Sequence, residues 1–144
     1  TGDEVVYVER AVPNRMMHVQ QRVGSRAPLH VTAVGKLMLG ATDDEDCHGY
    51  AQRTNLPAFT RNTINNLPRL IEECRRAYDQ GYALDNEGAE IGVGCIGVLI
   101  RDGNDTVVAG LSVSAPIERR RDVWVDDVVR AGREISQQLG HHSP

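Results

Sequence analysis

The stretch IGVGCIGVLIRDGNDTVVAGLSVSAPI, residues Ile91 to Ile117, decides the fold class. It contains two runs of β-branched and other apolar residues on either side of DGND, a turn-forming sequence, and this pattern predicts an antiparallel hairpin. A four-residue loop from Asp102 to Asp105 sets the expected register. Counted outward from Arg101 and Thr106, the expected pairs are Leu99 with Val108, Gly97 with Gly110, Cys95 with Ser112, and Val93 with Ser114.

The two faces of this hairpin differ in character. Because strand side chains alternate in direction, one face is expected to be an apolar surface that helices cover, made of Ile96, Val98, Ile100, Val107, Ala109, Leu111 and Val113. The other face carries small and polar residues, namely Cys95, Gly97, Gly110, Ser112 and Ser114. Opposed glycines weaken a sheet unless another group must approach the backbone, so this face predicts a hollow with a polar floor. The alternative is the solvated side of an antiparallel sheet.

Helical patterns lie on both sides of the hairpin. Thr32 is a suitable N-cap for a helix from Ala33 to about Gly40, and Thr42 or Asp43 can cap a second helix with an acidic first turn. Two longer helices are predicted from apolar stripes at spacings of three and four. The first stripe is Leu67, Leu70, Ile71, Cys74, Ala77 and Tyr78, bounded by Asn66, Pro68 and Gly81. The second is Trp124, Val125, Val128, Ala131, Ile135 and Leu139, within a helix from about Asp122 to Leu139.

Two strands are expected near the amino terminus. The sequence EVVYVER predicts a strand from Glu4 to Arg10, and MMHVQQRV predicts a second from Met16 to Val23. A turn at Ala11 to Asn14 joins them into a second hairpin.

The composition indicates one compact domain and excludes several classes of protein. A chain of 144 residues, 40% hydrophobic and 25% charged, is long enough for one core. Its formal net charge of -4 leaves no basic footprint for phosphates, so this chain alone is expected to bind DNA poorly. No apolar run approaches the roughly 18 to 20 residues that span a bilayer, and the amino terminus is acidic. A soluble, cytoplasmic protein is predicted.

No metal or cofactor is expected. Cys47, Cys74 and Cys95 form no CxxC pair, which favours reduced thiols over a disulfide framework and excludes a zinc finger. The five histidines lack the spacing of metal ligands.

The segment LHVTAVGKLMLGA, residues 29–41, raises the question of a phosphate-binding loop because it contains Gly35 followed by Lys36. Such a loop requires an earlier glycine, where this chain has His30, and a hydroxyl after the lysine, where it has Leu37. Both requirements fail, and the nucleotide-triphosphatase interpretation is rejected.

What remains is a helix start that can attract a carboxylate. The first N–H groups of a helix have no partner inside it and carry partial positive charge. Ala33 and Val34 would supply these groups, and Gly35 would allow close approach of another element. Lys36 could add charge, although a lysine on an amphipathic helix usually reaches solvent.

Several motifs occur in an order that resembles the effector-binding domain of the IclR family of bacterial transcription regulators. They are VGSRAPLHVTAVGKLMLGA, TINNLPRLIEECRRAYDQGYALDNEGAEIGVGCIGVLI, VVAGLSVSAPIERR and a last helix that ends ISQQLG. The resemblance covers about Glu4 to Gly140. It implies an α/β (α+β), GAF-like domain with a mainly antiparallel sheet, helices on one side and a small-molecule pocket on the other.

The resemblance also implies a function. Family members sense small organic acids, pass the signal to an amino-terminal winged helix-turn-helix domain that binds DNA, and form homodimers or homotetramers. That DNA-binding domain is expected to be absent from residues 1–144, which would form the effector-binding domain alone. The ligand contacts implied by the resemblance fall on the amides of Ala33 and Val34 and the side chains of Asp85, Cys95, Ser112 and Ser114, with Gly35, Val93, Gly97 and Gly110 lining the pocket.

Other interpretations of these residues stay open. Asp85 could stabilise a turn after Tyr82 and Ala83, and Cys95 could be a buried filler with no cationic neighbour to lower its pKa. The basic run in ERRRD, residues 118–122, is expected to be solvated. The competing functions are a small-acid-processing enzyme that uses Cys95 or Asp85, and an oligomerisation module with a degenerate pocket.

Overall fold

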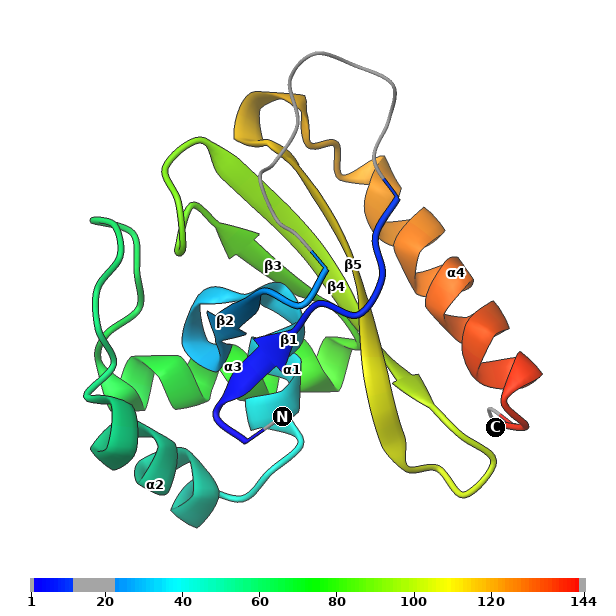
Figure 1. The fold of residues 1–144 in the computed structure, drawn as a ribbon, viewed down its shortest axis with the longest axis horizontal. Coiled ribbons are helices and arrows are strands. Elements are labelled where there is room, and N and C mark those ends of the chain that lie inside the picture. The colour runs from blue at the N-terminus through cyan, green and yellow to red at the C-terminus, as the bar shows by residue number, and fades with distance from the viewer. Residues whose placement is uncertain (1, 12–22, 143–144) are drawn as a thin grey trace.

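The computed structural model describes residues 2–11 and 23–142, and its centre is a three-stranded antiparallel sheet (Figure 1). The strands are β3 (Ala83–Asn86), β4 (Val93–Arg101) and β5 (Val107–Pro116), in the order β3-β4-β5. The predicted hairpin is confirmed as β4 and β5. The short strand β3 was not predicted, because four residues are too few to show a clear alternation.

The register of the hairpin differs from the prediction by two residues. The observed pairs are Cys95 with Ser114, Gly97 with Ser112, and Leu99 with Gly110. The turn accounts for one residue, because the N–H of Asp102 donates to the carbonyl of Thr106 (3.0 Å) and the loop is only residues 103–105. A bulge that leaves Val108 without a partner on β4 accounts for the other. From Ala109 onward the shift is even, so those side chains keep their predicted face, but the two glycines are not opposite each other. Val107 is shifted by only one residue and pairs with Arg101, a residue of the other face.

Helix α4 (Val123–Gln138) covers the apolar face of the sheet. Val128 is buried in a cluster with Ile96 and Val98, and Trp124 and Val125 pack against it. The predicted core face is therefore confirmed where β4 crosses α4, but it is wrong at Val113 on β5, which is 37% exposed.

The end of the predicted stripe on α4 is wrong. Ile135 and Leu139 are 38% and 48% exposed, and the buried positions are Gly132 and Ser136. A Cβ on Gly132 would lie 2.5 Å from Val98, and the Oγ of Ser136 accepts a hydrogen bond from a β4 amide (3.0 Å). Small residues therefore bring the helix close to the sheet, and the larger apolar ones are displaced outward.

The opposite face of the sheet is covered by α1 (Ala33–Gly40), and α3 (Leu67–Gln80) packs against α1 and β3. A Cβ on Gly40 would overlap the Cys74 carbonyl, so glycine permits this close helix contact. Helices therefore lie on both sides of β4 (Figure 1), whereas the family resemblance implied helices on one side only.

The predicted helix starts are confirmed. The capping side chains accept hydrogen bonds as follows: Thr32 from the Gly35 amide (3.0 Å), Asp43 from Asp46 (2.8 Å) and Asn66 from Arg69 (3.1 Å). Asp43 caps α2 (Asp44–Thr54), and Gly81 ends α3 in a left-handed conformation, with φ 90°.

The amino-terminal strands are shorter than predicted. Strand β1 (Glu4–Val6) pairs with β2 (Arg26–Pro28), a segment predicted only as a connection, and η1 (Leu29–Val31) then leads into α1. The predicted turn at Ala11 to Asn14 and strand from Met16 to Val23 lie almost wholly outside the described residues. Their described members, Ala11 and Val23, are not in strands.

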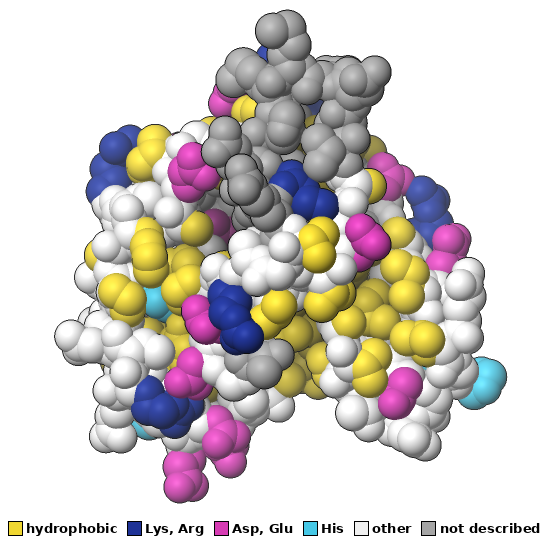
Figure 2. All heavy atoms as spheres, viewed as in Figure 1, with side chains coloured by type: hydrophobic (Ala, Val, Ile, Leu, Met, Phe, Trp, Pro, Cys, Tyr) yellow, Lys and Arg dark blue, Asp and Glu magenta, His cyan; other side chains and the backbone are white. Residues whose placement is uncertain are grey.

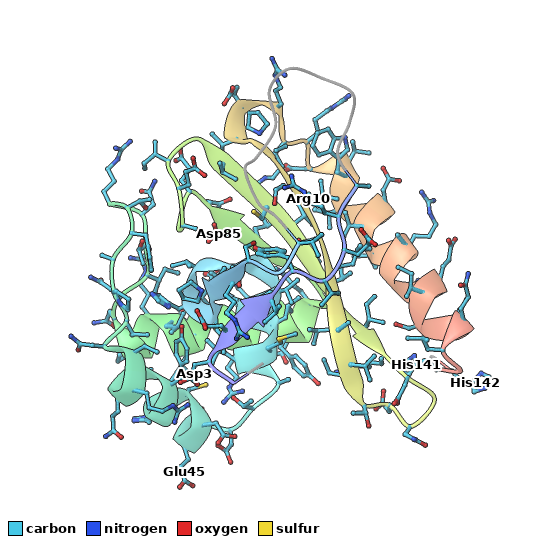
Figure 3. All side chains as sticks on the ribbon, viewed as in Figure 1. Asp3, Arg10, Glu45, Asp85, His141 and His142 are labelled. Atoms are coloured by element: carbon cyan, nitrogen blue, oxygen red, sulfur yellow. The ribbon has the colours of Figure 1, made fainter. Side chains whose placement is uncertain are left out.

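The surface carries charges of both signs. Figure 2 shows Lys and Arg interspersed with Asp and Glu over the visible face, as the small net charge predicts. Over residues 2–11 and 23–142, no helix is long and apolar enough to cross a membrane, and no group of three metal-ligating side chains occurs. Figure 3 shows His141 and His142 near the carboxyl terminus, far from Asp85, and His141 pairs with Asp105 (2.8 Å).

Candidate functional site

The centre of the candidate site is a row of three polar side chains across the sheet. Asp85 on β3 pairs with Cys95 on β4, which pairs with Ser114 on β5. Directly opposite residues in an antiparallel sheet point to the same face, and the Cys95 Sγ lies 3.2 Å from the Ser114 Oγ. The predicted juxtaposition of Cys95 with a serine is therefore present, with Ser114 as the directly paired residue.

The start of α1 lies beside this row. A Cβ on Gly97 would come within 2.9 Å of the Val34 nitrogen and the Ala33 side chain, and a Cβ on Gly110 would overlap Val34. The glycines therefore do admit another group, but that group is the helix start, so the hollow predicted at these two positions is filled. In the described part of the chain, the N–H groups of Ala33 and Val34 have no hydrogen-bond acceptor.

The remaining candidates fall around the same place. Ser112 is paired with Gly97 and is exposed. Val93 is paired with Pro116 at the end of the hairpin. Gly35 is buried against η1, where a Cβ would overlap the Leu29 carbonyl. The six candidate contact residues thus gather at one end of α1 and the adjoining sheet face.

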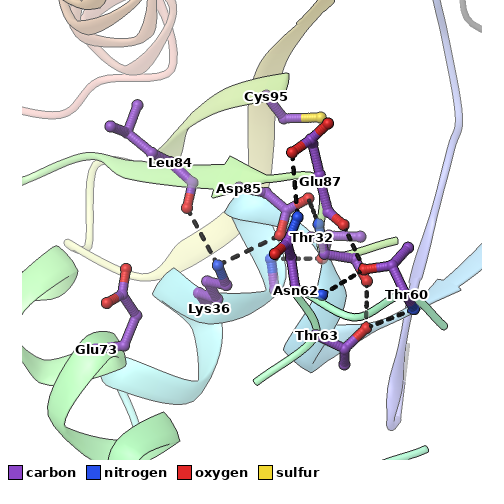
Figure 4. Close-up of polar contacts among 12 residues, drawn as sticks. Thr32, Lys36, Thr60, Asn62, Thr63, Glu73, Leu84, Asp85, Glu87 and Cys95 are labelled. Atoms are coloured by element: carbon purple, nitrogen blue, oxygen red, sulfur yellow. Dashed lines mark hydrogen bonds and ion pairs between the residues drawn. The ribbon is translucent and has the colours of Figure 1, made fainter. Parts of the chain in front are cut away.

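Lys36 forms an ion pair with Asp85 that was not predicted (Figure 4). Its Nζ lies 3.3 Å from the Asp85 Oδ1, and the two residues are only 5% and 2% exposed. The expectation that Lys36 reaches solvent is wrong. The sequence does contain a signal, because every other residue from Ala33 to Gly40 is apolar or glycine and the helix offers no polar face.

Burial dominates the electrostatics of Asp85. Desolvation raises the pKa of its carboxyl above the ordinary 3.8, while the Lys36 ammonium and the Gly88 N–H act in the opposite direction. The Gly88 N–H donates to Oδ2 (3.2 Å), but Oδ1 is buried and has no hydrogen-bond donor among the described residues. Lys36 is thus close enough to balance the charge without satisfying this oxygen.

Asp85 also stabilises a turn, as the alternative interpretation predicted, and this turn follows β3. Its bond to Gly88 holds the loop after the strand. The Oγ1 atoms of Thr60 and Thr63 donate to the carbonyls of Glu87 and Gly88, each at 2.6 Å (Figure 4). The loop beside Asp85 is therefore fixed from two sides.

The environment of Cys95 disfavours the thiolate form. Burial raises the pKa of the thiol, and the hydrogen bond with Ser114 lowers it only in part. A cationic neighbour exists, contrary to expectation: Arg120, which follows η2 (Ile117–Arg119), donates to the carbonyls of Asp85 (3.2 Å) and Cys95 (3.4 Å). Part of the ERRRD segment therefore supports the site from within, and is not wholly solvated.

The arrangement is suited to binding rather than to chemistry on a substrate. It offers free helix amides, a thiol and hydroxyls for a negatively charged or polar group, and a charge-balanced carboxylate for a hydrogen-bond donor. A protonated thiol is a weak nucleophile.

Comparison with known proteins gives a consistent family. Residues 1–141 match the family model described as the C-terminal part of the bacterial transcriptional regulator IclR. The regulator KdgR of Dickeya chrysanthemi is 33% identical over 144 residues, which is 97% of this chain and 47% of that protein. The repressor AllR of Salmonella typhi is 34% identical over 147 residues, 99% of this chain and 54% of that protein. The chain thus spans about half the length of these relatives.

Solved structures show the same fold. The IclR of Thermotoga maritima superposes with a TM-score of 0.86 at 33% identity, covering 98% of this chain and 59% of that one. The inducer-binding domain of PobR from Acinetobacter, a double mutant in complex with 3-hydroxybenzoic acid, gives 0.84 at 25% identity, covering 98% and 83%. The chain therefore belongs to the family of IclR C-terminal domains of bacterial transcriptional regulators.

Proposed function

We propose that this domain binds a small organic acid beside the start of α1, at the sheet face that carries Asp85, Cys95 and Ser114, and that binding controls a DNA-binding domain outside residues 1–144. The observation that carries the proposal is the row of Asp85, Cys95 and Ser114 beside the unbonded amides of Ala33 and Val34. Free amides at a helix start accept a carboxylate. The row can then orient the rest of the ligand.

The ion pair removes an electrostatic objection to this proposal. An unpaired Asp85 carboxylate would repel an acid, but Lys36 balances its charge at 3.3 Å. The Asp85 carboxylate is then an acceptor for a hydroxyl or other donor on the ligand. Each hydrogen bond to a charged group contributes about 1.5 to 3 kcal/mol. Two amides and two serines could therefore give roughly -6 to -8 kcal/mol, a dissociation constant in the micromolar range.

The comparisons support a sensor over an enzyme. The relatives are transcription regulators, and the PobR domain is described in complex with an aromatic acid. By analogy, the domain is proposed to work with an amino-terminal winged helix-turn-helix domain, as a homodimer or homotetramer, in the cytoplasm. The raised pKa of Cys95 offers no support for the alternative in which this thiol is a nucleophile.

A thermal-shift screen of keto, hydroxy and aromatic acids, followed by calorimetry, tests the site. At least one acid is expected to stabilise the domain, by about 2.7 kcal/mol at 100 times its dissociation constant. The Ser112→Ala/Ser114→Ala variant is expected to bind that acid at least about tenfold more weakly. Val113→Ala is the matched control, because Val113 lies between the two serines on the opposite face of β5.

Three outcomes would contradict the proposal. Equal binding by wild type and the double-serine variant would remove these serines from the site. Conversion of the acid to a product would indicate an enzyme. Failure of every acid to stabilise the domain would favour an oligomerisation module.

A further inference from the structure

Strand β5 has one open edge. It pairs with β4 on one side, and no strand of the described chain lies on its other side (Figure 1). Just beyond the paired residues, the Ile117 N–H donates to the Gly92 carbonyl (2.7 Å). Because bonding alternates along an antiparallel strand, this bond shows which backbone groups point away from β4, namely those of Gly110, Ser112 and Ser114. Within residues 2–11 and 23–142 these groups have no hydrogen-bond partner.

This edge lacks the features that usually protect an exposed strand. Such strands are short or carry charged residues and prolines, because open N–H and C=O groups invite pairing with another strand. The ten residues of β5, VVAGLSVSAP, include no charged side chain, and the single proline is the last residue. The bulge at Val108 disrupts only the beginning of the edge. The edge from Ala109 to Ala115 is therefore suited to a partner strand.

The sheet face beside this edge is incompletely covered. Helix α4 packs on β4, whereas Val108 and Val113 on β5 are 50% and 37% exposed. Figure 2 shows hydrophobic side chains gathered over β5 and α4. Directly opposite residues of neighbouring strands share a face, so a strand along the edge would place a side chain next to Val113. An apolar residue on that strand is expected to cover this valine.

The amino-terminal turn indicates where the partner strand comes from. Among the described residues, β1 pairs only with β2, so it too has an open edge. The turn at Gly2 and Asp3 leads directly into β1, and Gly2 has a left-handed φ of 63°. Glycine in this conformation is typical of the tight turns that join hairpin strands. Polypeptide ahead of this turn is thus directed back along β1, as a hairpin partner would be.

The proposed amino-terminal DNA-binding domain has to be connected to this turn. The chain spans only 47% of KdgR and 54% of AllR, and by analogy the polypeptide that makes the connection runs up to Gly2. A strand just ahead of the turn would pair with β1 on one edge and with β5 on the other. A single strand would then satisfy both open edges and join the two sheets.

From these features we infer that the open edge of β5 binds a strand formed by the polypeptide that connects the amino-terminal DNA-binding domain to Gly2. This strand bonds to the outward N–H and C=O groups of Gly110, Ser112 and Ser114. It therefore lies directly beside the two serines that are proposed to contact the effector. The inference rests on the proposed function for the presence of an amino-terminal domain, but it does not depend on ligand binding.

Hydrogen–deuterium exchange resolved at single residues tests this pairing. Residues 1–144 are compared with the longer protein that includes the amino-terminal domain, both without any ligand. The amides of Gly110, Ser112 and Ser114 are expected to exchange at least about 100-fold more slowly in the longer protein, because pairing protects them from solvent. The amides of Leu111 and Val113 face β4 and are expected to be protected in both proteins. Since no acid is added, a failure of effector binding would not change this result.

Two substitutions at one position provide the variant and its control. Ser112→Pro removes an outward N–H and places a ring at the edge without removing a donor to β4. In the longer protein it is expected to speed the exchange of the Gly110 and Ser114 amides at least about tenfold. Ser112→Ala keeps the N–H and is expected to leave their exchange unchanged. Continued protection of Leu111 and Val113 verifies that Ser112→Pro is folded.

The inference would be overturned by any of three results. The first is equal exchange of the three outward amides in residues 1–144 and in the longer protein. The second is protection in residues 1–144 that increases with protein concentration, which would mean that a second copy of the chain pairs with the edge. The third is unchanged exchange of Gly110 and Ser114 in a folded Ser112→Pro variant.

Discussion

Replacing Lys36 with methionine tests the electrostatic centre of this domain. Methionine preserves the length of the side chain and much of its packing, but it leaves the Asp85 carboxylate, 2% exposed, without the cation that lies 3.3 Å away. Removing one partner of a buried ion pair costs about 3 to 5 kcal/mol, because the remaining charge is desolvated and uncompensated. The domain is therefore expected to be strongly destabilised at neutral pH.

The pH dependence of this loss has a definite sign. Burial raises the pKa of Asp85 above 3.8, and Lys36 opposes that rise, so the variant has a higher folded-state pKa than the wild type. A carboxyl with a raised folded-state pKa loses its stability contribution as the pH rises from 3.8 through that pKa. Without Lys36 this loss extends to higher pH. The cost of the substitution is therefore largest at neutral pH and decreases on acidification toward 3.8.

The free energy needed to protonate Asp85 is the upper limit of the electrostatic cost of Lys36→Met, because the carboxyl can take up a proton instead of staying charged. Holding a proton at pH 7 on a carboxyl of ordinary pKa 3.8 costs about 4.4 kcal/mol, at 1.36 kcal/mol for each pH unit. At pH 5 the same calculation gives about 1.6 kcal/mol. We expect Lys36→Met to lose about 3 to 4 kcal/mol at pH 7 and less than about 2 kcal/mol at pH 5.

Urea unfolding of four proteins measures this effect. They are the wild type, Lys36→Met, Asp85→Asn and the double variant, in which no uncompensated charge remains. The double variant is expected to recover most of the stability lost in Lys36→Met and to show little pH dependence. An equal loss for Lys36→Met at both pH values, or a double variant as unstable as the single one, would refute the reasoning.

Three further predictions follow from packing and hydrogen bonding. Gly110→Ala places a methyl group against the stiff side chain of Val34 and is expected to lower the free energy of unfolding in urea by about 1 to 3 kcal/mol. Adding Val34→Ala to that variant is expected to restore much of the lost stability. If the double variant is no more stable than Gly110→Ala, the strain lies elsewhere. Arg120→Gln removes donors to two strand carbonyls and is expected to cost about 1 to 2 kcal/mol, whereas an unchanged urea midpoint would show that the bonds contribute nothing. Cys95 is expected to be alkylated slowly at pH 7 and faster as the pH rises. Ser114→Ala lacks the hydrogen bond that lowers the thiol pKa, so alkylation of Cys95 in this variant is expected to be slower still. Peptide mass spectrometry measures the rate, and faster alkylation in Ser114→Ala would contradict this account.

Local physical chemistry explains why the helices could be predicted. The caps at Thr32, Asp43 and Asn66 and the stop at Gly81 act within one helical turn of their own positions, so the sequence contains all the relevant information. The two faces of the hairpin are equally local, because they depend only on the alternation of side chains along a strand.

Local sequence patterns did not determine the register of the hairpin or the contact between α4 and the sheet. A one-residue difference in the turn and a bulge at Val108 each shift the pairing, and many sequences of the DGND type permit several loop lengths. On α4, apolar periodicity favoured Ile135 and Leu139, but only small residues at Gly132 and Ser136 fit at the close approach to the sheet.

Some features of the candidate site were also predictable from local sequence, and others were not. The sequence by itself determined that a helix with free amides begins at Ala33 and that a thiol and two hydroxyls share one face of the hairpin, since both follow from short-range periodicity. Only the tertiary structure decided that Lys36 is buried against Asp85 and that Arg120 donates to two strands. Lys36 and Asp85 are 49 positions apart in the chain, and Arg120 is 35 positions from Asp85 and 25 from Cys95. Partners at such separations are selected by how the helices and strands pack, and no local sequence pattern encodes that packing.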